Sequence, residues 1–271
     1  MWIIYLLIAA GLLSVLLLWA IMPGKRRNTA PFNSTLYAHR GLHTNDGRVP
    51  ENSIAAFRAA VAAGYGVELD VQFTADKQIV VFHDDDLKRM CGVDKRVDEL
   101  TYDELKQLRL LDSDQSIPLL SDVLNVLDGA TLLCEFKSMR SYTDTSLCEA
   151  ALPLLDAYKG AVCIESFNPF MVRWFRRCAP HYIRGILSKK FEKGEVAQVL
   201  RFPLSSLFAN GLCRPDFIAY QHTDHSQFFF RICRLFHPTT IAWTVKSPTE
   251  EQAANPHFDT IIFEGYLPAE K

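Results

Sequence analysis

The sequence lacks a surplus of charge of either sign. Among its 271 residues, 29 lysines and arginines stand against 31 aspartates and glutamates, so the formal net charge at pH 7 is −2. Proteins that bind nucleic acid concentrate positive charge on one surface, and we therefore expect no nucleic-acid partner. The chain also contains no G-x-G-x-x-G turn and no Walker loop, which argues against a doubly wound nucleotide-binding fold.

Paired cysteines are missing as well. The chain has 7 cysteines, an odd number, and none of them forms the C-x-x-C pair that many zinc and redox sites use. Several lie inside apolar runs, where a free thiol behaves as a small hydrophobic side chain. This cysteine usage favours a reducing compartment.

Charged side chains are absent from residues 2–22, which form one long apolar run. A helix rises about 1.5 Å per residue, so this run is long enough to cross a hydrocarbon core of about 30 Å. A cleaved signal peptide is the alternative, although no basic residue precedes the run and no clear A-x-A site follows it. Lys25, Arg26 and Arg27 follow directly, and the positive-inside rule then places the rest of the chain in the cytoplasm.

These observations predict a single-pass protein of the cell membrane with three parts. Residues 1–23 form the transmembrane helix, 24–34 a linker, and 35–271 a globular domain on the cytoplasmic side.

Short apolar runs alternate with helix-like segments from residue 35 onward, a pattern that produces parallel sheets. Eight such runs over this length predict a TIM (β/α)₈ barrel, with one extra strand at 78–83 after the second. An open doubly wound sheet is the alternative fold, but this sequence lacks the glycine-rich turn that such sheets use. The expected barrel strands are 36–38, 66–72, 131–137, 161–167, 183–187, 216–221, 240–245 and 260–264.

Capping residues mark the starts of several expected helices. Serine, threonine and asparagine accept hydrogen bonds from the first free backbone N–H groups of a helix, and proline is favoured at the first helical position. The expected N-caps are Asn52 or Ser53, Thr101, Asn168 and Ser247.

Charged side chains occur at alternate positions in two of the expected strands. Glu68 and Asp70 point to one face of their strand, and Glu135 and Lys137 do the same in theirs. Barrel enzymes build their sites at the C-terminal ends of the strands, where three carboxylates would supply the oxygen ligands that Mg²⁺ or Ca²⁺ prefers. The alternative is a set of buried ion pairs with Arg40 or Lys137.

Two histidines end strands at the same mouth. His39 closes the first strand and His83 the extra strand, and a pair of imidazoles can supply one general base and one general acid. Arg40 offers a planar fork of donors for a phosphate or a carboxylate, which indicates an anionic substrate. The remaining histidines are interpreted as surface or core residues: His43, His181, His222, His225, His237 and His257.

The order of these motifs resembles the glycerophosphodiester phosphodiesterase family. That family's pattern runs H-R-G, P-E-N-T/S, E-x-D-V-x-x-T-x-D, V-V-x-H-D and E-x-K. The corresponding segments here are His39-Arg40-Gly41, Pro50-Glu51-Asn52-Ser53, 68–76, Val80-Val81-Phe82-His83-Asp84 and Glu135-Phe136-Lys137. The resemblance implies a TIM barrel that uses a divalent cation to hydrolyse glycerophosphodiesters to sn-glycerol 3-phosphate and an alcohol.

The resemblance also implies a role for each matching residue. The metal ligands would be Glu68, Asp70 and Glu135, with Glu51 as a further ligand or a supporting group. The acid and base would be His39 and His83. The substrate contacts would be Arg40 and Lys137 at the phosphate and Trp243 in an aromatic wall on a late strand.

The C-terminal half departs from the family pattern. Lys246 stands where the family often has asparagine, and Phe263-Glu264-Gly265 stands where it often has a T-D-x-P-like strand. The sequence therefore does not determine the pocket for the alcohol. Phe167, Trp243 and Phe263 either line an apolar mouth or take part in ordinary barrel or helix packing.

Three functions are compatible with this pattern. A membrane-anchored phosphodiesterase would act on soluble glycerophosphodiesters, on lysophospholipids or on a phosphoglycerol polymer, because the anchor keeps the barrel near lipid. A phospholipase that forms a cyclic phosphate is a second hypothesis, and a non-catalytic membrane-tethered binding module is a third.

Overall fold

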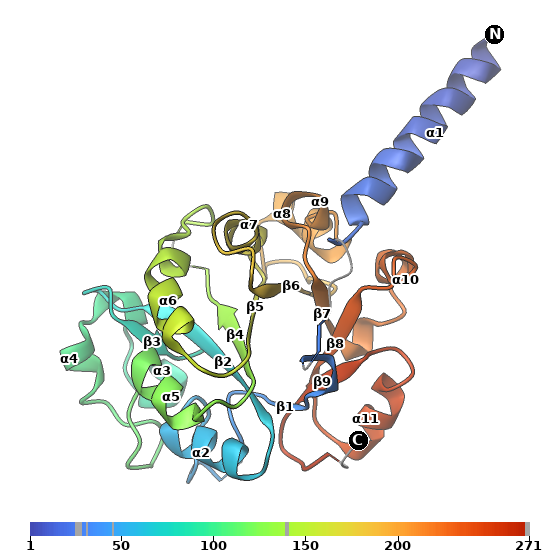
Figure 1. Cartoon of the computed structure of the whole chain (residues 1–271). Helices are drawn as coiled ribbons and strands as arrows, with labels where there is room; N and C mark the ends of the chain where they lie inside the picture. Colours follow the sequence, from blue (N-terminus) through green and yellow to red (C-terminus); the bar gives the residue numbers. More distant parts are fainter. Residues whose placement is uncertain (25–28, 31, 45, 139–140, 269–271) are drawn as a thin grey trace.

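Eight parallel strands close into a barrel surrounded by helices in the part of the chain that the structure describes (Figure 1). Their order is β1-β9-β8-β7-β6-β5-β4-β2, and β1 pairs with β2 to close the ring, while β3 pairs antiparallel with β2. This computed structural model describes residues 1–24, 29–30, 32–44, 46–138 and 141–268. The strands are β1 (Tyr37–Ala38), β2 (Gly66–Phe73), β3 (Ile79–Val81), β4 (Leu132–Phe136), β5 (Val162–Ser166), β6 (Ile183–Ser188), β7 (Phe217–Gln221), β8 (Thr239–Val245) and β9 (Thr260–Phe263).

The TIM barrel predicted from the sequence is confirmed. Every expected strand is present, and the observed ends differ from the expected ones by only one or two residues. The extra strand is also present, as β3, and its outermost pair with β2 joins Phe73 to Ile79 across a tight turn.

Helices cover the outside of the ring, and the predicted caps begin four of them. Ser53, not Asn52, caps α2, with its Oγ accepting from the Ala56 N–H at 3.1 Å. The side chains of Thr101, Asn168 and Ser247 cap α4, α7 and α11. The helices are α1 (Trp2–Ile21), α2 (Ile54–Ala62), α3 (Lys88–Cys91), α4 (Tyr102–Leu105), α5 (Leu120–Leu127), α6 (Ser146–Ala157), α7 (Pro169–Cys178), α8 (Gln198–Ser205), α9 (Asn210–Cys213), α10 (Phe228–Arg234) and α11 (Pro248–Ala254), with 3₁₀ turns at Phe32–Ser34, Val97–Glu99 and His222–Asp224.

The two faces of each barrel strand have different surroundings. Val67, Leu69 and Val71 point outward from β2 into the core that the barrel shares with its helices, and all three are fully buried. A second core fills the barrel itself, where a Cβ at Gly185 would lie 2.1 Å from the ring of Phe217. Because side chains alternate along a strand, the residues between the outward positions face the barrel axis.

The apolar helix α1 projects from the barrel (Figure 1). It is 20 residues long with a mean hydropathy of 2.6, so its length and composition suffice to cross a membrane. Its C-terminal end is held by side chains of the barrel domain. Asn210 Nδ2 donates to the carbonyl of Ile21 at 2.7 Å, and Arg214 Nη1 donates to those of Trp19 and Met22 at 2.8 and 2.6 Å.

The segment expected to be a linker contacts the barrel wherever the structure describes it. Gly24 N donates to Pro215 O at 2.7 Å, Thr29 and Thr239 share a hydrogen bond of 2.8 Å, and Phe32 joins the core inside the barrel. Residues 25–28 and 31 lie outside the described residues. The domain boundaries themselves stay a prediction.

Candidate active site

A tight turn after β1 positions the first two polar residues of the site. Arg40 and Gly41 have φ angles of 55° and 81°, in the left-handed region that favours glycine. A Cβ at Gly41 would lie 2.8 Å from the backbone carbon of Ala56, so the turn also needs glycine for its close approach to α2. The backbone N–H of Arg40 donates to Glu68 Oε2 at 2.9 Å, which ties this turn to β2.

Three buried carboxylates meet at the mouth of the barrel. Asp70 of β2 is in register with Glu135 of β4, and Glu68 lies two residues earlier on the same face. One oxygen from each lies within 4.8 Å of the others, and the residues are between 1% and 8% exposed. Asn52 Nδ2 donates to Asp70 Oδ2 at 2.9 Å and fixes that carboxylate in place. The sequence prediction that these three side chains converge is therefore correct.

Burial and mutual repulsion set the protonation of this cluster. Burial and the neighbouring negative charges raise the pKa values of Glu68 and Glu135. Burial also opposes ionisation of Asp70, but Lys137 and other nearby positive groups outweigh it and hold the pKa of Asp70 well below its usual range. Lys137 Nζ lies 3.0 Å from Asp70 Oδ1 and 2.9 Å from Glu135 Oε1. A further positive charge would relieve the remaining repulsion.

His39 lies beside this cluster and is held by a carboxylate that directly follows the last strand. Its Nδ1 is 2.6 Å from Glu264 Oε2, and its Nε2 is 4.0 Å from Glu68 Oε2. Burial lowers the pKa of His39 to about 4, and the hydrogen bond from His39 lowers the pKa of Glu264 to about 2. At neutral pH the ionised Glu264 therefore accepts the Nδ1 proton of a neutral imidazole, and the Nε2 lone pair is directed toward the carboxylates.

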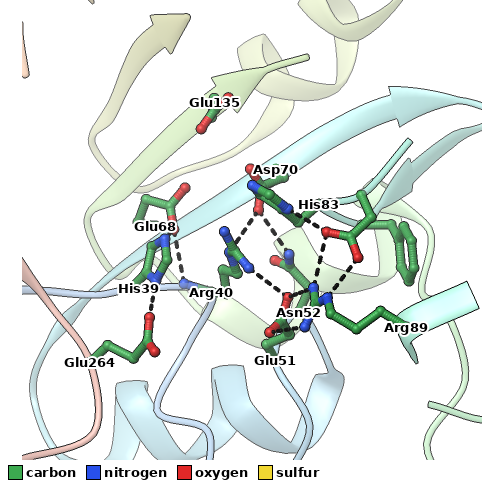
Figure 2. A network of polar contacts seen from close by, with 12 residues as sticks. His39, Arg40, Glu51, Asn52, Glu68, Asp70, His83, Arg89, Glu135 and Glu264 are labelled. Carbon is green, nitrogen blue, oxygen red and sulfur yellow. Dashed lines mark hydrogen bonds and ion pairs between the residues drawn. The ribbon is translucent and has the colours of Figure 1, made fainter. Parts of the chain in front are cut away.

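His83 forms the matching pair on the other side. Its Nδ1 lies 2.7 Å from Asp84 Oδ1, and Arg89 binds the same carboxylate through Nε and Nη2 at 2.7 and 3.0 Å (Figure 2). Gln72 Nε2 donates to the carbonyls of Phe82 and Asp84 at 2.8 and 2.9 Å, and these bonds hold the segment on either side of His83. Both histidines thus have one ring nitrogen fixed by a carboxylate.

Glu51 connects two arginines at the edge of the site. Its Oε1 accepts from Arg40 Nη1 at 2.7 Å, and both of its oxygens accept from Arg89, at 2.7 and 2.9 Å (Figure 2). Glu51 is not one of the three clustered carboxylates. In this arrangement it supports Arg40, which lies 3.5 Å from Asp70 Oδ2 through its Nε.

An aromatic wall borders the site. Trp243 and Phe167 meet edge to face with ring centroids 5.5 Å apart, and the buried Nε1 of Trp243 has no hydrogen-bond partner among the described residues. For Phe263 the sequence left two alternatives, the apolar mouth or ordinary packing, and the structure shows packing. Its ring packs against Tyr65 at 4.8 Å in the core outside the barrel.

A cleft brings both histidines, two of the three carboxylates and the aromatic wall together. It is lined by His39, Arg40, Glu68, His83, Glu135, Glu165, Phe167, Leu187, Trp243, Thr244 and Ile262.

Several residues of the site were missed by the sequence prediction. Glu264 and Asp84 hold the histidines, Asn52 and Arg89 hold carboxylates, and Glu165 lines the cleft at 1% exposure. Glu165 is in register with Glu135, and it shares the inward face of its strand with Cys163 as Glu135 does with Leu133. That spacing of two was a readable signal.

The barrel and its site match a known family. The model of the glycerophosphoryl diester phosphodiesterase family matches residues 39–251, which is most of the chain. The chain belongs to this family. The match begins at His39, the first histidine of the site.

Named relatives and solved structures agree with this membership. An uncharacterized Bacillus subtilis protein, YqiK, is 33% identical over 165 residues, which are 56% of this chain and 66% of the relative. A glycerophosphodiester phosphodiesterase of Caldanaerobacter subterraneus is 32% identical over 160 residues, or 55% of this chain and 65% of the relative. The matched region thus spans slightly less than two thirds of each of these relatives.

Two solved structures share the barrel. A glycerophosphodiester phosphodiesterase from Parabacteroides distasonis has a TM-score of 0.66 and 26% identity, covering 85% of this chain and 92% of that one. A phosphodiesterase from Oleispira antarctica, solved with sn-glycerol-3-phosphate, has a TM-score of 0.69 at 21% identity, covers 84% of this chain and 92% of its own, and supports the fold alone.

Proposed function

We propose that the chain is a membrane-anchored phosphodiesterase that hydrolyses glycerophosphodiesters to sn-glycerol 3-phosphate and an alcohol. The observation that carries the proposal is the pair of carboxylate-held histidines on either side of three buried carboxylates. An enzyme that cleaves a phosphodiester needs a base, an acid and compensation for phosphate charge, and this cleft contains side chains suited to each.

Glu68, Asp70 and Glu135 would hold a divalent cation, Mg²⁺ or Ca²⁺. The donor set fits such an ion, because it consists of carboxylate oxygens, and burial together with mutual repulsion raises two of the three pKa values. When bound, the cation would polarise the phosphoryl oxygens and compensate developing negative charge. Arg40 and Lys137 would contact the phosphate from the protein side.

His39 would act as the general base. Its neutral Nε2 can take the proton of the water that attacks phosphorus, and ionised Glu264 stabilises the imidazolium that results. His83, held by Asp84, would return a proton to the alkoxide as the phosphorus–oxygen bond to the alcohol breaks. If the neighbouring hydroxyl of the glycerol attacks instead, the product is a cyclic phosphate, which is the second candidate reaction.

The aromatic wall would face the organic part of the substrate. The indole N–H of Trp243, which has no hydrogen-bond partner among the described residues, would donate to a ligand oxygen, and Phe167 adds apolar surface beside it. Human lysophospholipase D GDPD1 is 35% identical over 125 residues, 41% of this chain and 39% of that protein. This likeness supports testing lysophospholipids beside the soluble diesters.

Helix α1 would span the cell membrane once, with the barrel on the cytoplasmic side. Its residues 2–19 are exposed and carry no charged side chain, and Lys25, Arg26 and Arg27 follow the helix in the sequence. Resistance to extraction at alkaline pH would support the anchor. An N-terminus found after residue 22 in the mature protein would instead show a cleaved signal sequence.

The test of the activity uses the full chain in mild detergent. Release of sn-glycerol 3-phosphate from glycerophosphocholine and glycerophosphoethanolamine is measured with Mg²⁺, with Ca²⁺ and with chelator. We expect metal-dependent release that falls by about 10²–10⁴-fold in His39→Ala. The matched control is His181→Ala, which removes an exposed histidine paired with Asp156.

The outcomes separate the hypotheses. Release that survives in His39→Ala would contradict the assigned base. If lysophospholipids react and the soluble diesters do not, the substrate is a lipid. Metal binding without turnover of any of these diesters would favour the non-catalytic binding module.

A further inference from the structure

Exposed apolar side chains gather on α8, on α10 and on the two residues that follow α10, beside the C-terminal end of α1. We define the α8–α10 patch as Val199, Phe202, Phe228, Leu235 and Phe236. They are 80%, 58%, 67%, 74% and 36% exposed, respectively. Single exposed apolar residues are ordinary, but a contiguous group of large ones marks an interaction surface.

Aromatic contacts join the α8 part of this patch to the start of α10. The ring of Phe229 in α10 lies 5.8 Å from Phe202 of α8 and 5.3 Å from the neighbouring Phe228. Phe208 lies 5.3 Å from both Phe202 and Phe229. The two helices therefore present their phenylalanines together, with most of the Phe202 and Phe228 surface left in solvent.

The patch has a fixed position relative to α1. Figure 1 shows α1 leaving the ring of helices beside α9 and α10. The Ile21 carbonyl accepts from Asn210 of α9 and lies 3.8 Å from the thiol of Cys233 in α10. Arg214 adds a cation–π contact, 4.4 Å from the Trp19 ring centroid. A membrane crossed by α1 would thus meet a defined side of the barrel.

The two segments that carry the patch are positively charged. Segments 196–214 and 225–238 contain Arg201, Arg214, Arg231 and Arg234 and no aspartate or glutamate, although Glu195 and Asp224 directly precede them and the whole chain carries a net charge of −2. A surface that combines exposed phenylalanine and leucine with arginine suits the headgroup region of an anionic bilayer. A second copy of the chain fits less well, because two such faces would bring like charges together.

We propose that the α8–α10 patch rests in the headgroup layer of the membrane that α1 spans, with anionic phospholipid as its partner. This inference rests on the membrane anchoring within the proposed function. The barrel is then held against the bilayer by its side at two places, and its orientation is set by the fold and not by a flexible tether.

The test is hydrogen exchange of the full chain in nanodiscs of phosphatidylcholine alone or with phosphatidylglycerol. When phosphatidylglycerol is present, we expect the amides of 198–205 and 228–236 to exchange more slowly by a factor of at least about five. The double variant Phe202→Glu/Phe228→Glu should lose this difference. The matched control, Leu111→Glu/Leu267→Glu, changes two apolar residues elsewhere that are 41% and 66% exposed, and should keep it.

If the chain is inserted and its amides exchange equally on both lipids, the proposed binding of the patch to anionic phospholipid is wrong, and the proposed anchor is unaffected. Failure of the chain to float with liposomes contradicts the anchor itself. Protection that rises with protein concentration and does not depend on lipid assigns the patch to a second copy and overturns the proposal. The exchange readout needs no turnover, so a result on phosphodiesterase activity does not affect it.

Discussion

The substitution Glu264→Gln is the most specific test of His39 as the general base, because it keeps the shape of the side chain that holds His39 and removes its charge. Glu264 Oε2 lies 2.6 Å from His39 Nδ1, a short distance typical of a charge-assisted hydrogen bond. Such a bond contributes about 1.5–3 kcal/mol, and each 1.36 kcal/mol is about tenfold in rate. If the bond strengthens as His39 takes the proton, kcat/KM should fall by roughly 10- to 150-fold.

The assay is kcat/KM of the full chain on glycerophosphocholine at saturating metal, because saturation separates His39 from any effect on metal affinity. Lys246→Met is the matched control. Its Nζ lies 3.3 Å from Glu264 Oε1 on a side chain that is 60% exposed, so the pair contributes at most about 1 kcal/mol. We expect less than about a fivefold change there. A Glu264→Gln enzyme within twofold of the wild type would refute the pairing as the source of His39 basicity.

Three further predictions concern the metal cluster and the barrel core. Asp70→Asn should weaken the binding of Mg²⁺ or Ca²⁺ in titration calorimetry, and unchanged affinity would remove Asp70 from the ligand set. The raised pKa values of Glu68 and Glu135 favour their protonated forms in the metal-free chain, so metal binding should release protons and tighten as pH rises. Calorimetry in buffers of different ionisation enthalpy measures that release, and a pH-independent affinity would contradict it. Gly185→Ala should lower the free energy of unfolding by about 1–3 kcal/mol through its clash with Phe217, and an unchanged melting temperature would show that the ring can move.

The barrel was predictable because its strands are short apolar runs separated by helices with clear caps. The E-x-D and E-x-K spacings also placed Glu68, Asp70 and Glu135 correctly, since the period of two decides which side chains share a face. The same rule could have excluded Phe263 from the cleft. Ile262 and Glu264 face inward, so the residue between them faces outward.

Long-range pairing was harder to predict than local pattern. Glu264 and His39 are 225 positions apart, and they meet only because β9 pairs with β1 when the barrel closes. The contact between α1 and the barrel could not be predicted either. Asn210 and Arg214 bind backbone carbonyls of α1, which every sequence has, so no side-chain motif indicates the contact. Hydropathy identifies an apolar helix but does not indicate what its end will contact.

The most direct test of the proposed hydrolysis is a ³¹P NMR time course of glycerophosphocholine with the full chain and Mg²⁺ or Ca²⁺. We expect the diester signal to be replaced by that of sn-glycerol 3-phosphate, and chelator to stop the change. A lasting cyclic phosphate would contradict attack by water. A diester signal that persists with either metal would contradict the proposed reaction on this substrate.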